Sequence, residues 1–415
     1  MGNVLREGFT TGSAATGAAL AALHFLVSGN APESARVPLP PMISQGCGQT
    51  SPARQQPRAW LELPVAACAP GPAPELLSAW SQHDAMVDPM PEAMSPECMG
   101  RAAHAVVIKD GGDDPDVTTG AHITATVVMG SSAASCTDVS PAEDRARAIA
   151  ICGGPGVGRV TLPGLPLPVG TAAINPVPRE QLRFALNAAL RALLGADAAL
   201  PQLWVFLSVP EGRDLAPKTF NPRLGIVGGI SILGTQGTVR PYSHAAWQAT
   251  IRQGLDVARA TGCQAVCCST GRRSERLLMA RYPELPAQSF VQVADFVAYS
   301  LKIAGEMDFR HIIWGCFFGK LVKLAQGHPY THAGSAALDM QALAQLARKE
   351  HAACAERIGQ CITAAHALDI LLADPAGPRV LACVVHRAAD ALRGFAGRAV
   401  RVHFYHFDGR EVLML

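Results

Sequence analysis

IIWGCFFGKLVK, residues 312–323, is an apolar strand followed directly by a glycine turn and a helix. Similar apolar runs of strand length recur after about residue 240, and stretches with helical spacing separate them. These runs lie at residues 265–269, 290–293, 380–385 and 400–404. Strands that alternate with helices in this way form parallel sheets. The second half of the chain is therefore predicted to be a doubly wound, mostly parallel, nucleotide-binding-like domain.

The first half mixes β-prone and helical segments without this regular alternation. The β-prone runs are residues 103–108, 121–128 and 203–209, and helical apolar spacing occurs at residues 178–194. This mixture is typical of an α+β domain. We place the boundary near Tyr242. The prediction is an α/β protein with an α+β domain of residues 1–241 and a Rossmann-like domain of residues 242–415.

A proline-rich excursion interrupts the first domain at residues 32–98. Residues 32–96 contain 13 of the 31 prolines, and only residues 59–65 resemble a strand. Because proline disrupts helices and central strands, we expect these residues to form an elaborated excursion on the surface.

Composition and charge limit the class of partner. Charged residues make up 16% of the chain and the net charge is +2, against a usual charged share of about 25%. No basic run of the kind that follows a phosphate backbone is present, so we expect no nucleic-acid partner. Residues 9–31 carry no charged side chain, but they are rich in Ala and Gly and are interrupted by His24. They are predicted to form a buried helix rather than a membrane span.

The 12 cysteines are scattered, with no C-x-x-C pair. This spacing favours neither a disulfide framework nor a zinc site. Single thiols in apolar segments pack as small core residues, which suits a protein of the reducing cytoplasm. The sequence leaves homo-oligomerisation open.

LREGFTTGSAA, residues 5–15, leads a hydroxyl-rich turn into a helix. Amides at a helix start, together with the hydroxyls of Thr10, Thr11 and Ser13, suit a carboxylate or phosphate. A helix cap without a ligand has the same pattern, so both interpretations stay open here.

Two Asn-Pro turns place an arginine close by. AINPVPR, residues 173–179, ends on Arg179, and KTFNPRLGIVGGISILGTQG, residues 218–237, contains Asn221 and Arg223. Arginine matches planar carboxylates, and glycine lets the backbone approach a large flat ligand. Structural turns are the alternative, because Asn-Pro is ordinary turn chemistry.

KDGGDDPDVTTG, residues 109–120, gathers Asp110, Asp113, Asp114 and Asp116 behind Lys109. Clustered carboxylates repel one another, so a metal, turn amides or a proton-transfer role must justify them. The spacing is not that of an EF-hand. A turn in which Asp side chains bond their own backbone is the alternative.

Two glycine patterns resemble nucleotide loops only weakly. GGPGVGR, residues 153–159, lacks a convincing preceding strand, and its proline removes an amide. The G-x-x-x-G-K of residues 315–320 lacks one spacer and the Ser or Thr of a P-loop. At the end of a strand, the second loop remains a candidate for a small ligand.

The chain resembles the cobalt-precorrin-5B C1-methyltransferase family of anaerobic cobalamin biosynthesis. The resemblance runs from about residue 5 to residue 327 and fades beyond it. It rests on the stretches GFTTGSAA, VIKDGGDDPDVTTGA, GGPGVGRVTLPGL, AINPVPR, KTFNPRLGIVGGISILGTQGTV and GKLVKLAQG.

The resemblance implies transfer of a methyl group from S-adenosylmethionine to carbon 1 of a tetrapyrrole whose cobalt belongs to the substrate, with no metal held by the protein. The tetrapyrrole carries many carboxylates, so cations and polar turn groups are expected to bind it. These substrate-binding candidates are Thr10, Thr11, Ser13, Lys109, Arg159, Arg179, Asn221 and Arg223. Asp113 or Asp114 is expected to face the ring and to orient or accept a proton.

Ligands of doubly wound sheets bind at the carboxyl ends of the strands. We therefore expect the cofactor at residues 269–272 and 315–320. The cofactor-binding candidates are Ser269, Thr270, Gly271, Gly315, Gly319 and Lys320.

The chain departs from the family pattern in four places, Asp295, Cys316, Phe317 and Ala333. Cys316 and Phe317 stand where the family has a Gly-His pair. A catalytic histidine beside Gly319 and Lys320 is therefore excluded, and His332 becomes a weaker candidate. Two rival functions are a non-catalytic corrinoid or anion carrier and a metal-dependent hydrolase built on the Asp cluster. Binding of S-adenosylmethionine and sensitivity to a chelator distinguish them.

Overall fold

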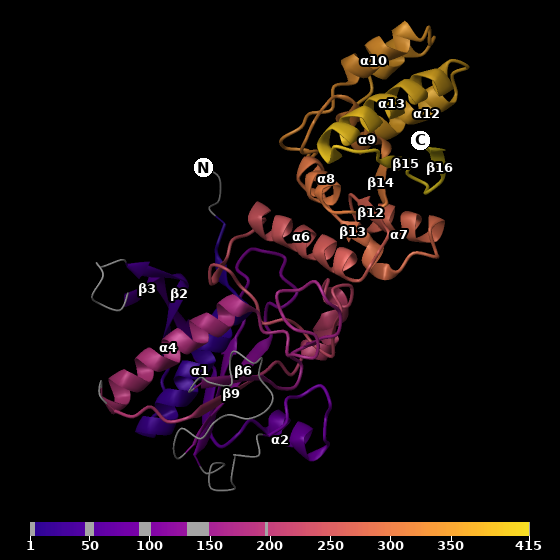
Figure 1. The fold of residues 1–415 in the computed structure, drawn as a ribbon. Coiled ribbons are helices and arrows are strands. Elements are labelled where there is room, and N and C mark those ends of the chain that lie inside the picture. Colours follow the sequence, from indigo (N-terminus) through magenta and orange to yellow (C-terminus); the bar gives the residue numbers. More distant parts are fainter. Residues whose placement is uncertain (1–4, 46–53, 91–100, 131–148, 196–197, 415) are drawn as a thin grey trace. The chain divides into compact units, whose positions relative to one another are not determined.

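A computed structural model describes residues 5–45, 54–90, 101–130, 149–195 and 198–414. The chain divides into two compact units, Met1–Ser243 and His244–Leu415. Figure 1 draws both, and each is described below by itself.

Unit 1 is built on a sheet of five described strands in the order β4-β5-β6-β9-β7. All neighbours are antiparallel except β7 and β9. The predicted β-prone runs are thus confirmed, whereas β7 and β4 were not predicted. The strands are β4 (Ala67–Pro70), β5 (Ala102–Ile108), β6 (His122–Met129), β7 (Ile149–Gly153) and β9 (Leu203–Ser208).

Helices cover both faces of this sheet. Alternate residues such as Ile151 and Val205 pack against α1 (Thr11–Ser28) and α4 (Pro176–Leu194), while their neighbours Cys152 and Phe206 pack against α2 (Pro74–Ser81). The period of two in each strand therefore supplies apolar residues to both layers.

α1 confirms the predicted buried helix. By length and composition it could cross a membrane, yet 67% of it is buried inside the protein. Its many alanines allow close packing on α4 and β5, and it ends at Gly29 in the left-handed conformation. α1 is the central core helix of unit 1.

The prediction that residues 32–98 form only a surface excursion is wrong for the described part. β2 (Ser34–Gln45) and β3 (Arg54–Pro64) form an antiparallel hairpin, β4 extends the main sheet, and α2 covers it. Leu76 is fully buried. The prolines are tolerated because edge strands and a helix start need fewer amide donors. The remainder of the excursion lies outside the described residues.

A glycine-dense segment, residues 226–239, runs along three other parts of unit 1. Its strands β10 (Ile226–Val227) and β11 (Thr238–Val239) pair with β8 (Arg159–Val160) and β1 (Gly8–Phe9), and a bridge joins Ile232 to Ile174. Short helices α5 (Gly212–Leu215) and η1 (Ala216–Lys218) precede it. The motifs that contain Phe9, Arg159 and Ile174 therefore all contact this segment.

Glycine at two of these crossings is required by geometry. Gly156 has φ +74°, and a Cβ there would lie 1.8 Å from the carbonyl oxygen of Val209. A Cβ on Gly229 would lie 2.1 Å from the carbonyl oxygen of Gly156. These glycines let backbone pack on backbone, rather than on the flat ligand that the sequence had suggested.

Unit 2 has a sheet of five described strands in the order β13-β12-β14-β15-β16, parallel except for β16. The predicted mostly parallel sheet is therefore confirmed. The order reverses at β12, so that β12 and β14 flank a topological switch point. The strands are β12 (Ala265–Ser269), β13 (Phe290–Gln292), β14 (His311–Phe317), β15 (Arg401–Tyr405) and β16 (Glu411–Met414).

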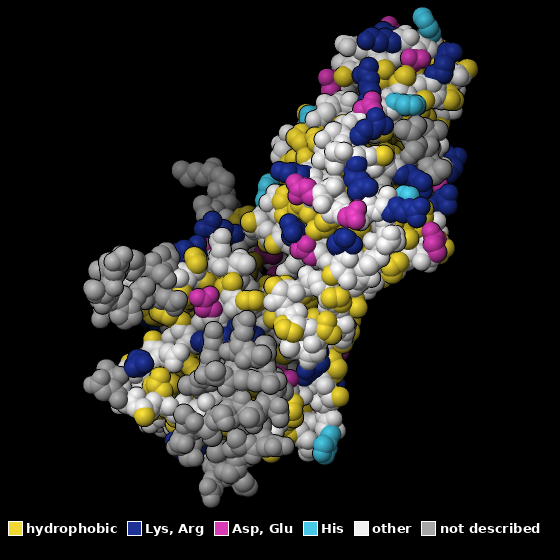
Figure 2. All heavy atoms as spheres, in the orientation of Figure 1, with side chains coloured by type: hydrophobic (Ala, Val, Ile, Leu, Met, Phe, Trp, Pro, Cys, Tyr) yellow, Lys and Arg dark blue, Asp and Glu magenta, His cyan; other side chains and the backbone are white. Residues whose placement is uncertain are grey.

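Helices cover both faces of the unit 2 sheet, with α7 packed on one and α6, α8, α9 and α13 on the other (Figure 1). On the face in view, basic and acidic side chains intermingle over the helices of unit 2 (Figure 2). The elements are α6 (His244–Ala260), α7 (Arg272–Arg281), η2 (Ala287–Ser289), α8 (Val297–Glu306), α9 (Phe318–Ala325), α10 (Met340–Lys349), α11 (Ala355–Gly359), α12 (Ala364–Leu372) and α13 (Gly377–Ala396).

One predicted strand is wrong, because residues 380–385 lie inside α13. Val380, Leu381, Val384 and Val385 are buried at helical spacing. A short apolar run does not distinguish a strand from the buried face of a helix. The longer pattern through Leu392 favours the helix.

Replacing Gly156 with Ala should lower the free energy of unfolding by about 3 kcal/mol, since the new methyl group meets a backbone oxygen at a positive φ. Urea unfolding followed by circular dichroism measures this. Gly394→Ala is the control, because Gly394 lies in α13 and an added methyl group there would meet no described atom within 4 Å. It should raise stability by up to about 1 kcal/mol. A neutral Gly156→Ala would contradict the backbone contact.

Candidate functional site

Three predicted motifs meet at the start of α1. The amide of Phe9 donates to the carbonyl oxygen of Asp110 at 2.9 Å, and the amides of Thr10 and Gly12 donate to Gly237 and Leu233, each at 3.0 Å. The N-terminal turn, residues 5–15, is therefore held between the Asp loop, residues 109–120, and the glycine-dense segment.

The hydroxyls of this turn are also engaged. Thr10 caps α1 by accepting from the amide of Ser13, Thr11 accepts from the amide of Leu233 at 2.9 Å, and Ser13 donates to Gly237 at 2.8 Å. All three residues are buried. Their observed bonds join the helix to residues 231–237, so a role toward an anion stays a prediction.

The Asp loop carries two ion pairs. Asp110 pairs with Arg6, whose hydrogen bond holds the pKa of that carboxyl below its ordinary value. Asp116 pairs with Lys109, Nζ to Oδ2 at 2.9 Å, and accepts from Thr118. Burial opposes ionisation of Asp116, but Lys109 and Thr118 outweigh it and lower the pKa. The Lys109 side chain is 1% exposed.

Asp113 and Asp114 each accept one described backbone amide. The donors are Arg6, 2.7 Å from Asp113 Oδ2, and Tyr242, 3.0 Å from Asp114 Oδ1. Asp113 is exposed and Asp114 half-buried. Among the described residues, no group of three or more His, Cys, Asp and Glu side chains is arranged for a metal ion.

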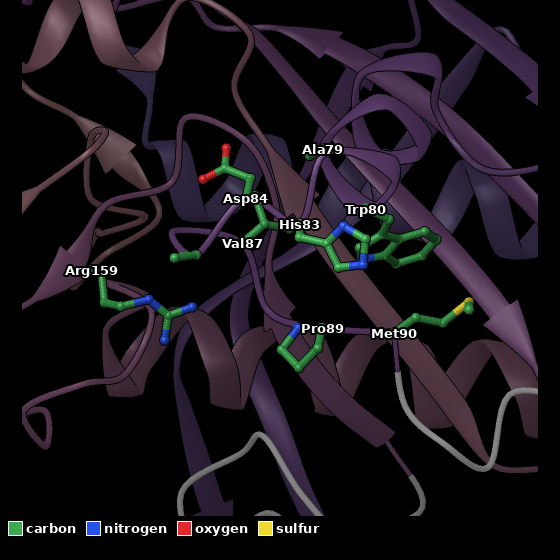
Figure 3. A pocket seen from close by; sticks show the side chains of 9 residues that line it. Ala79, Trp80, His83, Asp84, Val87, Pro89, Met90 and Arg159 are labelled. Atoms are coloured by element: carbon green, nitrogen blue, oxygen red, sulfur yellow. The ribbon is translucent and has the colours of Figure 1, made fainter.

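Arg159 lines a pocket of about 550 Å³ together with residues of α2 and the loop that follows it (Figure 3). Its guanidinium donates to Asp88 Oδ1 at 2.7 Å, and Asp88 Oδ2 accepts from the amide of Gly153 at 2.6 Å. The pocket connects the GGPGVGR turn to the proline-rich region.

The other predicted substrate residues lie deeper. Arg179 is buried and donates to the carbonyl oxygens of Ile174 and Ile151. Asn221 is buried and bonds Gly229 and Ser231 within its own turn. Arg223 is half-buried. The first two arrange the loops along the glycine-dense segment.

The predicted cofactor residues gather at the carboxyl edge of the unit 2 sheet. Ser269, the last residue of β12, lies opposite Gly315 of β14 across the switch point. Thr270 and Gly271 lead directly into α7. A Cβ on Gly315 would lie 2.5 Å from Leu278, so this glycine lets α7 pack on the sheet.

Two features of this edge point to a ligand. The hydroxyl of Ser269 is fully buried and has no hydrogen-bond partner among the described atoms. No described side chain caps α7, and a methyl group on Gly271 would meet no described atom within 4 Å. An orphan hydroxyl beside uncapped helix amides suits an anionic or polar ligand group.

Lys320 is less open than predicted. Its ammonium pairs with Asp295 and donates to the carbonyl oxygen of Thr331, which also accepts from Lys323. Thr331 in turn donates to Asp295 Oδ1 at 2.8 Å. Gly319 adjoins Lys320 in α9.

Of the other departures, Cys316 is fully buried, and burial raises the pKa of its thiol to about 12. Cys267 and Cys268 of β12 are fully buried too, as predicted for core thiols. Phe317 is half-buried and Ala333 exposed. Cys316 is thus an apolar core residue rather than a nucleophile.

Sequence reasoning missed several partners. Arg6 and Asp88 lie far along the chain from their partners, and only the fold pairs them with Asp110 and Arg159. An aromatic cluster is also new: the rings of Phe296 and Tyr330 are 5.0 Å apart, and each is 5.2 Å from His244. The spacing of these residues along the chain does not indicate such contacts.

Two family models match the chain: CbiD over residues 1–51 and 85–241, and the CbiD C-terminal domain over residues 330–414. The cobalt-precorrin-5B C(1)-methyltransferase of Nitratidesulfovibrio vulgaris is 47% identical over 98% of this chain and 92% of its own length. The Geobacillus kaustophilus protein of the same name is 40% identical over 85% of this chain and 78% of its own length. A crystal structure of a cobalamin biosynthesis protein (cbiD) from Archaeoglobus fulgidus is 22% identical, with a TM-score of 0.33 over 76% of this chain and 78% of that one.

Asp116→Asn should lower the free energy of unfolding by about 3 kcal/mol, because it leaves the buried ammonium of Lys109 without a counter-charge. Lys109→Met should cost less, since Asp116 is 22% exposed and keeps its bonds to Thr118. Urea unfolding of both variants measures the difference.

The same pair predicts a pH dependence. The folded-state pKa of Asp116 lies below its ordinary value of 3.8, so its stabilisation is present above that value and is lost as the pH falls through the lowered pKa. Asp116→Asn should therefore be less sensitive to acid than the parent chain. Equal costs for the two substitutions at neutral pH would contradict the buried-charge account.

Proposed function

The chain belongs to the CbiD family, and on that premise we propose that it is a cobalt-precorrin-5B C(1)-methyltransferase of cobalamin biosynthesis. The observation that carries this function is 47% identity over 98% of the chain to a relative of that name. The enzyme methylates carbon 1 of a cobalt-precorrin tetrapyrrole and acts as a soluble cytoplasmic protein.

The function is tested by incubating the protein with cobalt-precorrin-5B and S-adenosylmethionine that carries a ¹³C-methyl group. We expect one labelled methyl group on carbon 1, detected by NMR, and an equal amount of S-adenosylhomocysteine. Binding of the tetrapyrrole without binding of S-adenosylmethionine favours the carrier alternative. Loss of activity with a chelator that leaves the substrate's cobalt in place favours the metal-dependent alternative.

S-adenosylmethionine, when bound, supplies the methyl group from its sulfonium. The chain's own part is to align the two reactants, exclude water and stabilise charge, and no covalent nucleophile is needed. Cys316 is consistent with this, because its buried thiol stays protonated.

The cofactor site in this proposal is the carboxyl edge of β12 and β14. The buried hydroxyl of Ser269 donates to the cofactor, and the amides that begin α7 after Thr270 and Gly271 receive its carboxylate. Gly315 lets α7 pack closely on β14 beside this edge, and Gly319 lies next to Lys320 in α9. Asp295, held by Lys320, and the rings of Phe296 and Tyr330 offer an electron-rich wall for the sulfonium.

The tetrapyrrole is assigned to unit 1. Its carboxylates need cations at a surface, which Arg159 and Arg223 offer because both are only half-buried. Lys109, Arg179 and Asn221 are buried, and each stabilises a neighbouring loop through its own bonds. Thr10, Thr11 and Ser13 fix the helix start against the same loops.

Asp113 and Asp114 are the proposed proton-handling pair. Asp110 and Asp116 are neutralised by Arg6 and Lys109, whereas each of these two has only a backbone amide as its described donor. One of them faces the ring and orients or accepts the proton that carbon 1 methylation releases.

Ser269→Ala should weaken binding of S-adenosylhomocysteine roughly tenfold, the usual worth of one hydrogen bond. Stability should stay equal or rise, because the hydroxyl lacks a described partner in the protein. Titration calorimetry and thermal unfolding measure the two quantities.

Ser289→Ala is the matched control. Its hydroxyl is likewise buried without a described partner, but it precedes β13 and lies at the amino edge of the sheet. We expect the same gain in stability and unchanged affinity. Equal affinity losses in both variants would overturn the placement of the cofactor.

Asp114→Asn should lower turnover about 10²-fold while cofactor affinity and fold stay intact, in line with the size of general acid–base effects. Asp113→Asn identifies which carboxylate of the pair acts. Unchanged turnover in both variants would reduce the Asp cluster to a structural turn.

A further inference from the structure

The pocket beside Arg159 has mostly apolar walls. Trp80 and Ala79 come from the end of α2, and Val87, Pro89 and Met90 come from the loop after it (Figure 3). Its volume of about 550 Å³ lies within the range of about 300–1,000 Å³ that small-molecule sites occupy.

Hydrogen bonds, an ion pair and ring packing within unit 1 hold these walls in place. The indole nitrogen of Trp80 donates to the carbonyl oxygen of Asp88 at 3.1 Å, and its ring packs edge-to-face on Phe206, with centroids 5.0 Å apart. Asp84 pairs with Arg213 and accepts from the amide of Met86. A pocket formed in advance loses little entropy when a ligand binds.

One polar group in the pocket is incompletely satisfied. Arg159 bonds Asp88 and Gly170 through its terminal nitrogens, but its buried Nε has no partner among the described atoms. A buried donor without an acceptor costs free energy unless a ligand supplies one.

His83 also lines the pocket. Its φ of +53° belongs to the turn that ends α2, in which the amides of His83 and Asp84 donate to the carbonyl oxygens of Trp80 and Ala79 at 3.2 and 3.0 Å. The end of α2 therefore places His83 at the pocket wall. In Figure 3 the imidazole is drawn in front of the Trp80 ring.

We propose that this pocket binds one pyrrole-derived ring of the tetrapyrrole with its carboxylate side chain. The ring lies against Trp80 and Met90, and the carboxylate accepts from Arg159 Nε. This inference rests on the proposed function and adds to it a place for one edge of the substrate. Residues 79–84 lie between the two segments that the CbiD model matches, so this recognition depends on an elaboration of the shared domain.

Two probes test the proposal: porphobilinogen, a single pyrrole with one acetate and one propionate, and uroporphyrin III, a tetrapyrrole with the same side chains on each ring. The protein is labelled with 5-fluorotryptophan and its ¹⁹F NMR spectrum is recorded with and without each probe. The resonance of Trp80 is identified as the one that is missing from the spectrum of Trp80→Phe. We expect both probes to shift this resonance.

Met90→Trp fills the pocket and should weaken uroporphyrin binding about tenfold or more, measured by porphyrin fluorescence anisotropy. Met90→Phe is a smaller replacement in case the first variant unfolds. Ile362→Trp, at a residue 94% exposed in unit 2, adds the same side chain elsewhere and should leave binding unchanged.

Unchanged uroporphyrin affinity in the filled-pocket variants, or an unmoved Trp80 resonance, would overturn the proposal. Porphobilinogen binding that Met90→Trp blocks, with uroporphyrin unaffected, would assign the pocket to a separate small pyrrole and also contradict it. Methyl transfer by the parent chain is measured in parallel. Transfer without probe binding contradicts this inference alone, whereas probe binding without transfer contradicts the proposed function alone.

Discussion

Direct contact between backbones holds unit 1 together. Residues 226–239 pass so close to residues 156–160 and to the start of α1 that side chains cannot be accommodated at Gly158 and Gly229. The amides and hydroxyls of residues 10–13 are engaged along the same segment. The loops that carry Thr10, Arg159 and Asn221 are therefore positioned by this one packing constraint.

In unit 2 the candidate site depends on the strand order rather than on close backbone packing. The order brings Ser269 and Gly315 together at the switch point. Helices on the two faces bury the rest of the sheet, and polar side chains stand at the ends of β12 and β13, Ser269 and Gln292. The orphan hydroxyl of Ser269 is the observation on which the proposed cofactor site at this edge rests.

The parts that could be predicted from sequence are those with local periodicity. The strands β5, β6, β9, β12, β14 and β15 follow from their apolar runs, and α1 follows from a long uncharged stretch rich in Ala and Gly. Residues 380–385 misled because a short valine-rich run also fits a buried helix face. The strands β2 and β4 were missed because proline was taken as a breaker, although edge positions tolerate it.

Site residues divide in the same way. The sequence places Lys109 and Arg179 in suggestive motifs, but burial is a property of the fold, and both are buried in unit 1. Their partners are far away in the chain or are backbone carbonyls. Asp88 is separated from Arg159 by 71 residues and Arg6 from Asp110 by 104, so no local pattern predicts these pairs. Asp295 likewise became significant only through Lys320.

Hydrogen–deuterium exchange of the full chain with and without S-adenosylhomocysteine tests most directly the assignment of cofactor and substrate to different units. The account predicts slower exchange at residues 269–275 and 315–320, with residues 109–120 and 221–239 unchanged. Protection confined to residues before 240 would contradict it.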